Sequence, residues 1–288
     1  DVPTLKVHTL RRKGKRVVLE VMNVPRYILD KNKKVTLDGD HFFTNKLIFF
    51  VTLSRNIELN TIQHYPKNRE KGTMLDGLKA VLRLYGARGF VVRIFNADNE
   101  FECSREELLE LGVVLNTASA NEHCPFIERR IRLIKEKGRA VRHGLPYAVM
   151  PKLMIAELLY FVVHWLNAFP AKNGVSNTIS PGTIMTGGTP DYKKYCKANF
   201  GSYVQTHEEF VPRNSMAART IGAITLGPDN SEQAGYWFMS LNTGKRIHRR
   251  NWTPLPMPDE VVSRVEKLGK EMVNQTCWCS LTSMVIIC

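Results

Sequence analysis

The chain has 288 residues and carries 41 Lys and Arg against 27 Asp and Glu, a formal net charge of +14 at pH 7. This excess favours a polyanionic partner, because a cationic surface releases the counterions condensed on nucleic acid. The 43% hydrophobic and 9% aromatic content excludes a disordered basic tail. A membrane span is also excluded, because the longest apolar candidate, 153–166, contains Glu157 and His164.

The cysteines do not form a disulfide or metal-binding pattern. They include no CxxC motif, and no pair of histidines at ligand spacing accompanies them. Their low density makes a disulfide-stapled secreted fold improbable at this length. Cys277-Trp-Cys279 could bind a metal, but free thiols in a loose terminus are the favoured interpretation. The six positions are Cys103, Cys124, Cys196, Cys277, Cys279 and Cys288.

Residues 1–34 are predicted to be a basic N-terminal extension. The run from Leu10 to Arg16 is interpreted either as a solvated arm or as a contact to phosphate. The chain begins at Asp1 without a methionine or an apolar signal core. We therefore expect it to be a piece of a longer protein.

Strands and helices are predicted to alternate from Val35 onward. Thr44-Asn45-Lys46 separates the first two strands and indicates a hairpin, while the apolar run Phe90–Phe95 is typical of a strand buried on both faces. This order predicts a mixed sheet covered by helices. Strands are predicted at 35–43, 46–54, 56–63, 89–96 and 113–116, and helices at 71–85, 104–111, 125–138 and from 151 to before Pro170.

From Asn199 the pattern changes to short apolar runs separated by glycines, which is typical of a small β-barrel. Asn242-Thr243-Gly244 indicates a hairpin turn within it. After Pro258 an amphipathic stretch leads into an apolar, Cys-rich end. The predicted strands lie at 203–206, 223–226, 236–241 and 246–248.

Three carboxylates occupy positions that favour chemistry. Asp40 lies within a predicted strand, where Asp is disfavoured, and a charge facing a core must be paired or bind metal. Asp98 follows the end of the buried strand, where ligands gather in open α/β sheets. Glu128 lies in the first turn of the helix that Pro125 begins. Each has a plainer interpretation, as a turn residue or a complement to the helix dipole, and Asp38 competes with Asp40.

A basic stripe follows Glu128 on one side of the same predicted helix. Arg132, Lys135 and Arg139 stand four, seven and eleven residues after Glu128, whereas isoleucines at 127, 131 and 134 share the core side. Carboxylate oxygens suit Mg²⁺ or Mn²⁺, and two such ions serve phosphodiester chemistry. The basic stripe would then hold a phosphate backbone.

The order strand Asp, strand-end Asp, helix Glu resembles the ribonuclease-H-like core of retroviral-type integrases, and local strings resemble integrases of copia-type LTR retrotransposons. The resemblance covers roughly residues 35–257. In the core it rests on 40–55 for the first-aspartate strand and hairpin, 96–101 for the second-aspartate motif, 121–132 for the glutamate helix, and 165–170 and 180–187 for the next helix and loop. Strings within 200–250 resemble the small SH3-like domain.

This resemblance implies an α/β fold: a ribonuclease-H-like mixed five-stranded sheet flanked by helices, followed by a small SH3-like β-barrel. The implied domains are a catalytic core over 35–190 and an SH3-like domain over 196–257, preceded by an extension over 1–34 that lacks the family's zinc module. Residues 258–288 are expected to be a disordered or aberrant tail, because the end resembles no family segment.

The implied activity is that of a divalent-metal-dependent polynucleotidyl transferase and endonuclease, which processes DNA 3′ ends and transfers strands into target DNA. By resemblance, Asp40 would touch both of two Mg²⁺ (or Mn²⁺) ions, and Asp98 and Glu128 one each. Arg132, Lys135 and Arg139 would contact DNA. The implied partners are double-stranded DNA, both element ends and target, and further copies of the chain on that DNA, with no membrane.

The implied location is the nucleus, reached through a cytoplasmic virus-like particle. Two other functions stay open: a catalytically inactive nucleic-acid-binding remnant of a decayed element, and a host-adopted structural DNA-binding protein. The missing zinc module and an Asp98–Glu128 interval shorter than in the family favour the remnant. The complete set of Asp40, Asp98 and Glu128 favours the enzyme.

Overall fold

The computed structural model describes residues 22–65, 71–117, 124–189, 191–208, 218–229 and 235–273. These fall into two compact units. The mixed-sheet unit takes its described residues from 21–139 and 162–190, and the antiparallel unit from 140–161 and 191–276. The predicted catalytic domain of 35–190 differs from this division, because residues 140–161 cluster with the antiparallel unit. Their contacts explain it: the Tyr147 hydroxyl donates to the Gly201 carbonyl at 2.7 Å.

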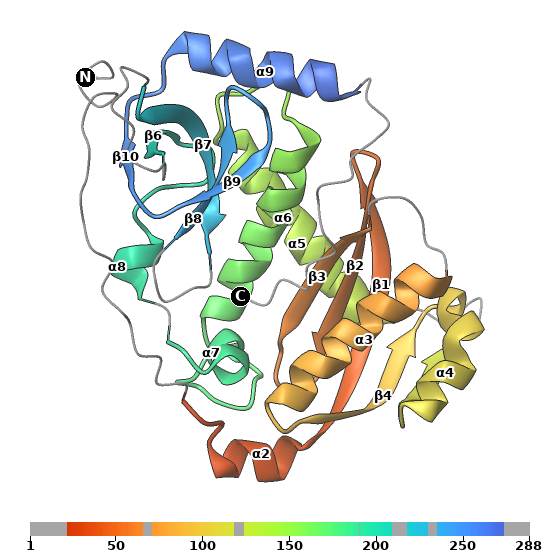
Figure 1. Ribbon diagram of the computed structural model, residues 1–288. Coiled ribbons are helices and arrows are strands. Elements are labelled where there is room, and N and C mark those ends of the chain that lie inside the picture. The colour runs from red at the N-terminus through yellow and green to blue at the C-terminus, as the bar shows by residue number, and fades with distance from the viewer. Residues whose placement is uncertain are drawn as a thin grey trace. The chain divides into compact units, whose positions relative to one another are not determined.

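The mixed-sheet unit contains the predicted five-stranded sheet, in the order β3-β2-β1-β4-β5 (Figure 1). Strands β1, β2 and β3 run antiparallel, while β1, β4 and β5 run parallel. The hairpin at Asn45 and Lys46 is confirmed, since both have positive φ, 49° and 64°, as a two-residue turn of this kind requires. The bounds are Lys34–Thr44 for β1, Leu47–Ser54 for β2, Asn60–Tyr65 for β3, Val91–Ala97 for β4 and Val114–Thr117 for β5.

The third strand begins later than predicted. Residues 55–59 form a turn instead, in which the Glu58 N–H donates to the Ser54 carbonyl at 2.9 Å. The Leu59 N–H donates to the Ser54 hydroxyl at 3.1 Å. Glu58 has a φ of 61°, so this short segment cannot continue a strand.

Helices cover both faces of the mixed sheet. On one face, α3 (Lys71–Ala87) buries Met74, Leu78 and Tyr85 against the alternate β1 residues Val35 and Leu37. The other β1 residues, Asp40 and Phe42 among them, face α5 (Pro125–His143). The remaining elements are α2 (Arg26–Asn32), the 3₁₀ helix η1 (Asn99–Ser104), α4 (Arg105–Glu110), the second half of α6 (Lys152–Ala168) and α7 (Pro181–Thr186).

Helix α2 corrects the prediction that residues 1–34 are only a basic extension. Its Ile28 is 1% exposed and joins the core beneath α3, so this segment belongs to the mixed-sheet unit. Residues 1–21, including the basic run at 10–16, lie outside the described part.

The antiparallel unit is a sheet in the order β10-β6-β7-β8-β9, in which the last strand returns to pair with the first. Its core contains Val204, Ala223, Tyr236 and Phe238, with Trp252 packed against them. The predicted strands and the turn at Gly244 are confirmed. The bounds are Tyr203–His207 for β6, Thr220–Pro228 for β7, Tyr236–Ser240 for β8, Arg246–Arg249 for β9 and Trp252–Pro254 for β10, with α8 at Tyr192–Tyr195.

Helix α9 (Asp259–Val273) corrects the expected disorder of residues 258–288. Val261, Val265 and Leu268 are buried at helical spacing, and the Glu266 carboxylate accepts the Ala148 N–H at 2.7 Å. The rest of that tail, with Cys277, Cys279 and Cys288, lies beyond the described residues. None of the helices that the structure describes is long and apolar enough to cross a membrane.

A buried ion pair joins α6 to β9 inside the antiparallel unit. Glu157 is 3% exposed, and its Oε1 lies 2.9 Å from Nε of Arg246. The Arg246 guanidinium stacks 3.7 Å from the Trp237 ring centroid. Burial raises the pKa of Glu157 to about 7, against the opposing effect of Arg246.

Glu157→Ala is therefore expected to lower the free energy of unfolding at pH 8 by about 3–5 kcal/mol, because it leaves the Arg246 charge without its partner. Chemical denaturation of both proteins measures the loss. The double variant Glu157→Met, Arg246→Met is the control and should lose much less, since no charge stays buried. Equal losses in the single and double variants would contradict the pair's role.

Candidate active site

Asp40 and Asp98 are neighbours on adjacent parallel strands. The β1–β4 register pairs Gly39 with Ala97, which puts Asp40 beside Asp98 at the carboxyl end of β4. Asp98 is the N-cap of η1, and its Oδ1 accepts the Asn99 N–H at 2.8 Å. This parallel pairing, within the mixed sheet that the sequence predicted, brings together two acids that are far apart in the chain.

Glu128 lines the same groove as Asp40. It lies in the first turn of α5, where its N–H donates to the Cys124 carbonyl at 3.2 Å. The groove is open, with a volume of about 620 Å³. The basic stripe of α5 lines it as well: its walls are Asp40, His41, Phe42, Phe43, Glu128, Ile131, Arg132, Lys135, Glu136 and Arg139.

The acids interact electrostatically. The pKa of Asp40 is raised to about 6, first by burial and then by the nearby charges of Asp98, Glu100 and Glu128. The His41 N–H, 2.6 Å from Asp40 Oδ1, opposes this increase. Carboxylates within electrostatic reach of each other, with a perturbed pKa, are typical of functional sites.

The acids are nevertheless not drawn into coordination geometry. Within the described residues, no group of three or more His, Cys, Asp or Glu side chains is placed to hold a metal ion. The donor set itself fits a hard divalent cation, because it consists of carboxylate oxygens. Burial and then the charges of the neighbouring acids raise the pKa of Asp40, and a cation would oppose both effects.

Glu100 is a fourth carboxylate of this region that the sequence did not reveal. Its Oε2 lies 3.3 Å from Nδ1 of His41, whose ring stacks on Phe101 at 5.0 Å between centroids. Glu100 lies near Asp40 because η1 begins directly after Asp98. No periodicity in the sequence marks η1.

Asp38 shares a strand face with Asp40, as residues two apart do, but its oxygens are already used. It is fully buried, and Arg55 donates to both of its oxygens, at 2.7 and 2.8 Å. The Asn96 amide donates to Oδ1 at 2.6 Å. Asp38 is thus a structural anion, which leaves Asp40 as the acid exposed to the groove.

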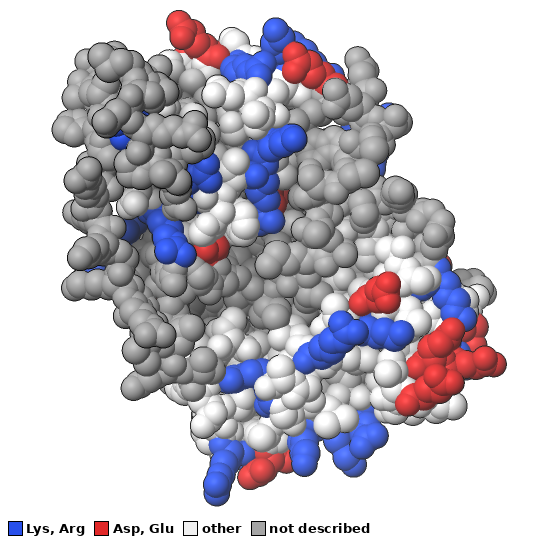
Figure 2. Space-filling model, in the orientation of Figure 1, with Lys and Arg blue, Asp and Glu red and all other residues white. Residues whose placement is uncertain are grey.

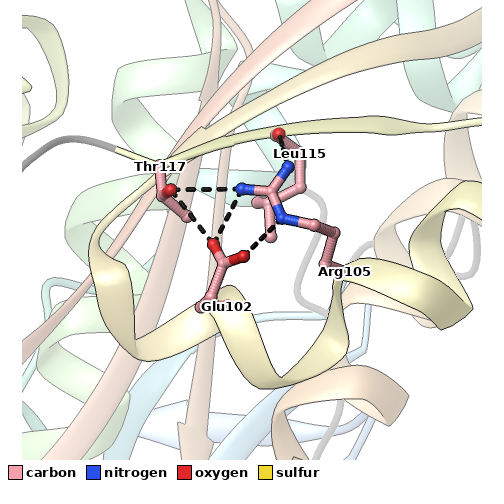
Figure 3. Close-up of polar contacts among 4 residues, drawn as sticks. All are labelled: Glu102, Arg105, Leu115 and Thr117. Atoms are coloured by element: carbon pink, nitrogen blue, oxygen red, sulfur yellow. Dashed lines mark hydrogen bonds and ion pairs between the residues drawn. The ribbon is translucent and has the colours of Figure 1, made fainter.

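A network around Arg105 holds the segment that follows Asp98 (Figure 3). Its guanidinium pairs with Glu102 of η1, donates to the Leu115 carbonyl at 2.9 Å, and donates to the Thr117 hydroxyl at 3.3 Å. Thr117 in turn donates to Glu102 at 3.1 Å. This network joins η1 to the end of β5, and so it restrains the turn that begins at Asp98.

No protein-family model matches the chain, and no curated protein matches it. Solved structures do. The catalytic core domain of BIV integrase is 21% identical, and the match covers 52% of this chain and 92% of that one at a TM-score of 0.36. The HTLV-2 integrase catalytic core domain, in complex with magnesium in a trimeric form, is 15% identical. That match covers 54% of this chain and 96% of the other, also at a TM-score of 0.36.

These structural neighbours are retroviral integrase catalytic cores, and this chain contains the mixed five-stranded sheet with flanking helices that its sequence predicted. A TM-score of 0.36 is too low to carry function to this chain. Its function is therefore inferred from its own residues.

Asp40→Asn is expected to stabilise the fold above pH 7. A carboxyl whose pKa rises on folding stabilises the folded state while protonated, and this contribution is lost as pH increases from 3.8 through about 6. The gain from Asp40→Asn should be about 1–2 kcal/mol at pH 8, after allowance for solvent screening, and close to zero at pH 4. Urea denaturation across pH measures it.

The matched control is Asp76→Asn on the exposed side of α3, which removes the same charge away from the groove. It should show no comparable dependence on pH. A stabilisation by Asp40→Asn that is the same at pH 4 and pH 8 would contradict the electrostatic coupling of Asp40.

Proposed function

We propose that this chain is an integrase catalytic fragment of a copia-type retrotransposon, a polynucleotidyl transferase that processes DNA 3′ ends and transfers them into target DNA. One observation carries the proposal. Asp40, coupled to Asp98 and Glu128, lines one groove with Arg132, Lys135 and Arg139. Acids for metal and cations for phosphate on one surface are what phosphodiester chemistry needs.

Asp40, Asp98 and Glu128 would hold Mg²⁺ or Mn²⁺, and we propose two ions. When bound, such ions activate the attacking oxygen and stabilise the leaving one. Asp40 would contribute most to the affinity for the ion, because a cation would offset the cost of burying its charge and its repulsion by Asp98 and Glu128. The α5 stripe would bind the DNA backbone, with Lys135 held near the groove by Phe42, whose ring centroid lies 5.1 Å from Nζ.

The charge of the mixed-sheet unit is uneven, with a cluster of acids on η1 and α4. Figure 2 shows acidic side chains gathered over η1 and α4, at one corner of the mixed-sheet unit. A polyanion is repelled by this corner. The acidic residues there are Glu100, Glu102, Glu106, Glu107 and Glu110.

The antiparallel unit is proposed to be the SH3-like domain over 196–257. Its support is the five-stranded antiparallel sheet in which β10 returns to pair with β6, with Trp252 packed against Tyr236 and Phe238. By the resemblance of its sequence, we also propose that the chain acts as a homo-oligomer on double-stranded element ends and target DNA. The same resemblance is the basis for proposing nuclear action after passage through a virus-like particle.

The alternative is a nucleic-acid-binding remnant without turnover. The open arrangement of the acids favours it, since no three described side chains are placed to hold an ion. Titration with Mn²⁺ separates the two functions: an enzyme's acids bind the ion and close on it, whereas a displaced Glu128 binds it poorly.

Asp98→Asn is expected to reduce Mg²⁺- or Mn²⁺-dependent strand cleavage and joining to background. The change keeps the size of the side chain but removes a ligand charge that neutralises the ion. The measurement is strand transfer of a labelled duplex by the full chain, with an upstream zinc module supplied. DNA affinity is the control and should be almost unchanged. Activity that persists in Asp98→Asn overturns the site, and inactivity of both proteins favours the remnant.

Lys135→Ala is expected to weaken binding to duplexes of any sequence and to reduce the slope of log affinity against log salt by about 1, because one phosphate contact is lost. Fluorescence anisotropy at several salt concentrations measures both. Lys71→Ala removes the same charge from α3, where Lys71 pairs with Glu107 at 2.5 Å. An unchanged slope in Lys135→Ala, or an equal change in both variants, argues against contact at the groove.

A further inference from the structure

The first turns of α5 contact the turn of residues 55–59 at two points. The guanidinium carbon of Arg55 lies 4.9 Å from the ring centroid of Phe126, within cation–π range. Arg130 forms an ion pair with Glu58. Phe126 and Arg130 stand one helical turn apart, two residues on either side of Glu128.

Arg55 is itself held firmly. Its side chain donates two hydrogen bonds to Asp38, which is fully buried, and its backbone N–H donates to the Thr36 carbonyl at 3.1 Å. A buried carboxylate cannot give up its cationic partner without a large cost. The cation beneath Phe126 is therefore fixed to the centre of the sheet through β1.

The second contact is also shielded from water. The Glu58 and Arg130 side chains are 17% and 18% exposed, so salt screens this pair less than a surface pair. Glu58 has a φ of 61°, a conformation that costs energy for a residue with a side chain. The 55–59 turn keeps this conformation while presenting the Glu58 carboxylate to Arg130.

The geometry of a helix decides what two such contacts do. Residues four apart lie on the same side, whereas a residue two positions away points to nearly the opposite side. Contacts at Phe126 and Arg130 therefore set the rotation of the helix about its axis, and this directs Glu128 away from the turn. Glu128 needs such support, because first turns of helices fray.

We propose that the turn of residues 55–59 is a positioning device, in which Arg55 and Glu58 hold the start of α5 so that Glu128 faces Asp40 across the groove. This role rests on the proposed catalytic function for its consequence, but the clamp itself can be tested without activity. Arg55, Glu58, Phe126 and Arg130 act through Glu128 and touch no substrate.

The test uses charge reversal in the full chain: Glu58→Arg, Arg130→Glu, and the two together. Each single variant should speed hydrogen exchange of the amides of residues 127–131 relative to the rest of α5. Each should also lower the rate of Mn²⁺-dependent cleavage by roughly 10- to 100-fold, the cost of a small misplacement of a catalytic group. The double variant should recover most of both, because it restores an ion pair of reversed polarity.

Lys71→Glu is the matched control, since it makes the same change of charge as Arg130→Glu but breaks the pair with Glu107 on the other face of the sheet. Exchange at 127–131 and the turnover rate should change in Arg130→Glu and stay unchanged in Lys71→Glu. The milder Glu58→Gln, which keeps the size of the side chain, replaces Glu58→Arg if that variant does not fold.

Exchange at 127–131 that is the same in the single variants and in Lys71→Glu overturns the clamp. So does a double variant no better than the singles. A wild-type chain with no metal-dependent cleavage would instead refute the proposed function, and the exchange measurement would still decide whether the turn holds α5.

Discussion

The pairing of β1 with β4 is the contact on which the site depends, because it puts carboxylates on the central strand of the sheet. A charge on the central strand of a sheet costs more free energy to bury than a charge elsewhere in it. A buried carboxylate there must be paired, unless its function requires it to be unpaired. Asp38 accepts hydrogen bonds from Arg55 and Asn96. Asp40, two residues on, instead lies near Asp98, Glu100 and Glu128, and its pKa is raised first by burial and then by their charges. One strand thus carries a paired anion and a repelled one, and only the repelled one lines the groove.

Two polar networks hold the segments that carry the repelling acids. Arg105 ties the segment after Asp98 to β5, and the turn of residues 55–59 ties the start of α5 to β1. Elsewhere the elements are held by apolar packing, with Leu37, Phe50 and Phe95 on one face. Packing of this kind stabilises a fold but tolerates small shifts, whereas charge pairs with fixed geometry specify direction. Stability and the orientation of the acids therefore come from different residues.

The antiparallel unit also combines apolar packing with a charge pair. Its small core of Val204, Ala223, Tyr236 and Phe238 is supplemented by the Glu157–Arg246 pair, which joins α6 to β9. A small β-sheet core supplies limited stabilisation. The buried pair adds specificity for one arrangement of helix and strand more than it adds stability, because desolvation offsets much of its attraction.

The sequence by itself determined what depends on neighbours along the chain. The hairpin at Asn45-Lys46, the existence of a strand before Asp98 and the alignment of Arg132, Lys135 and Arg139 behind Glu128 result from turn chemistry and from periods of two and 3.6 residues. The same strand was predicted to be buried on both faces, which is wrong, because Val91 and Ile94 are exposed. Only the tertiary structure decided that Arg55 pairs with Asp38, that Glu100 lies near Asp40, and that α9 packs where disorder was expected. Such contacts join residues distant in sequence. They depend on strand register and on how helices pack against a sheet, and no local sequence pattern predicts either.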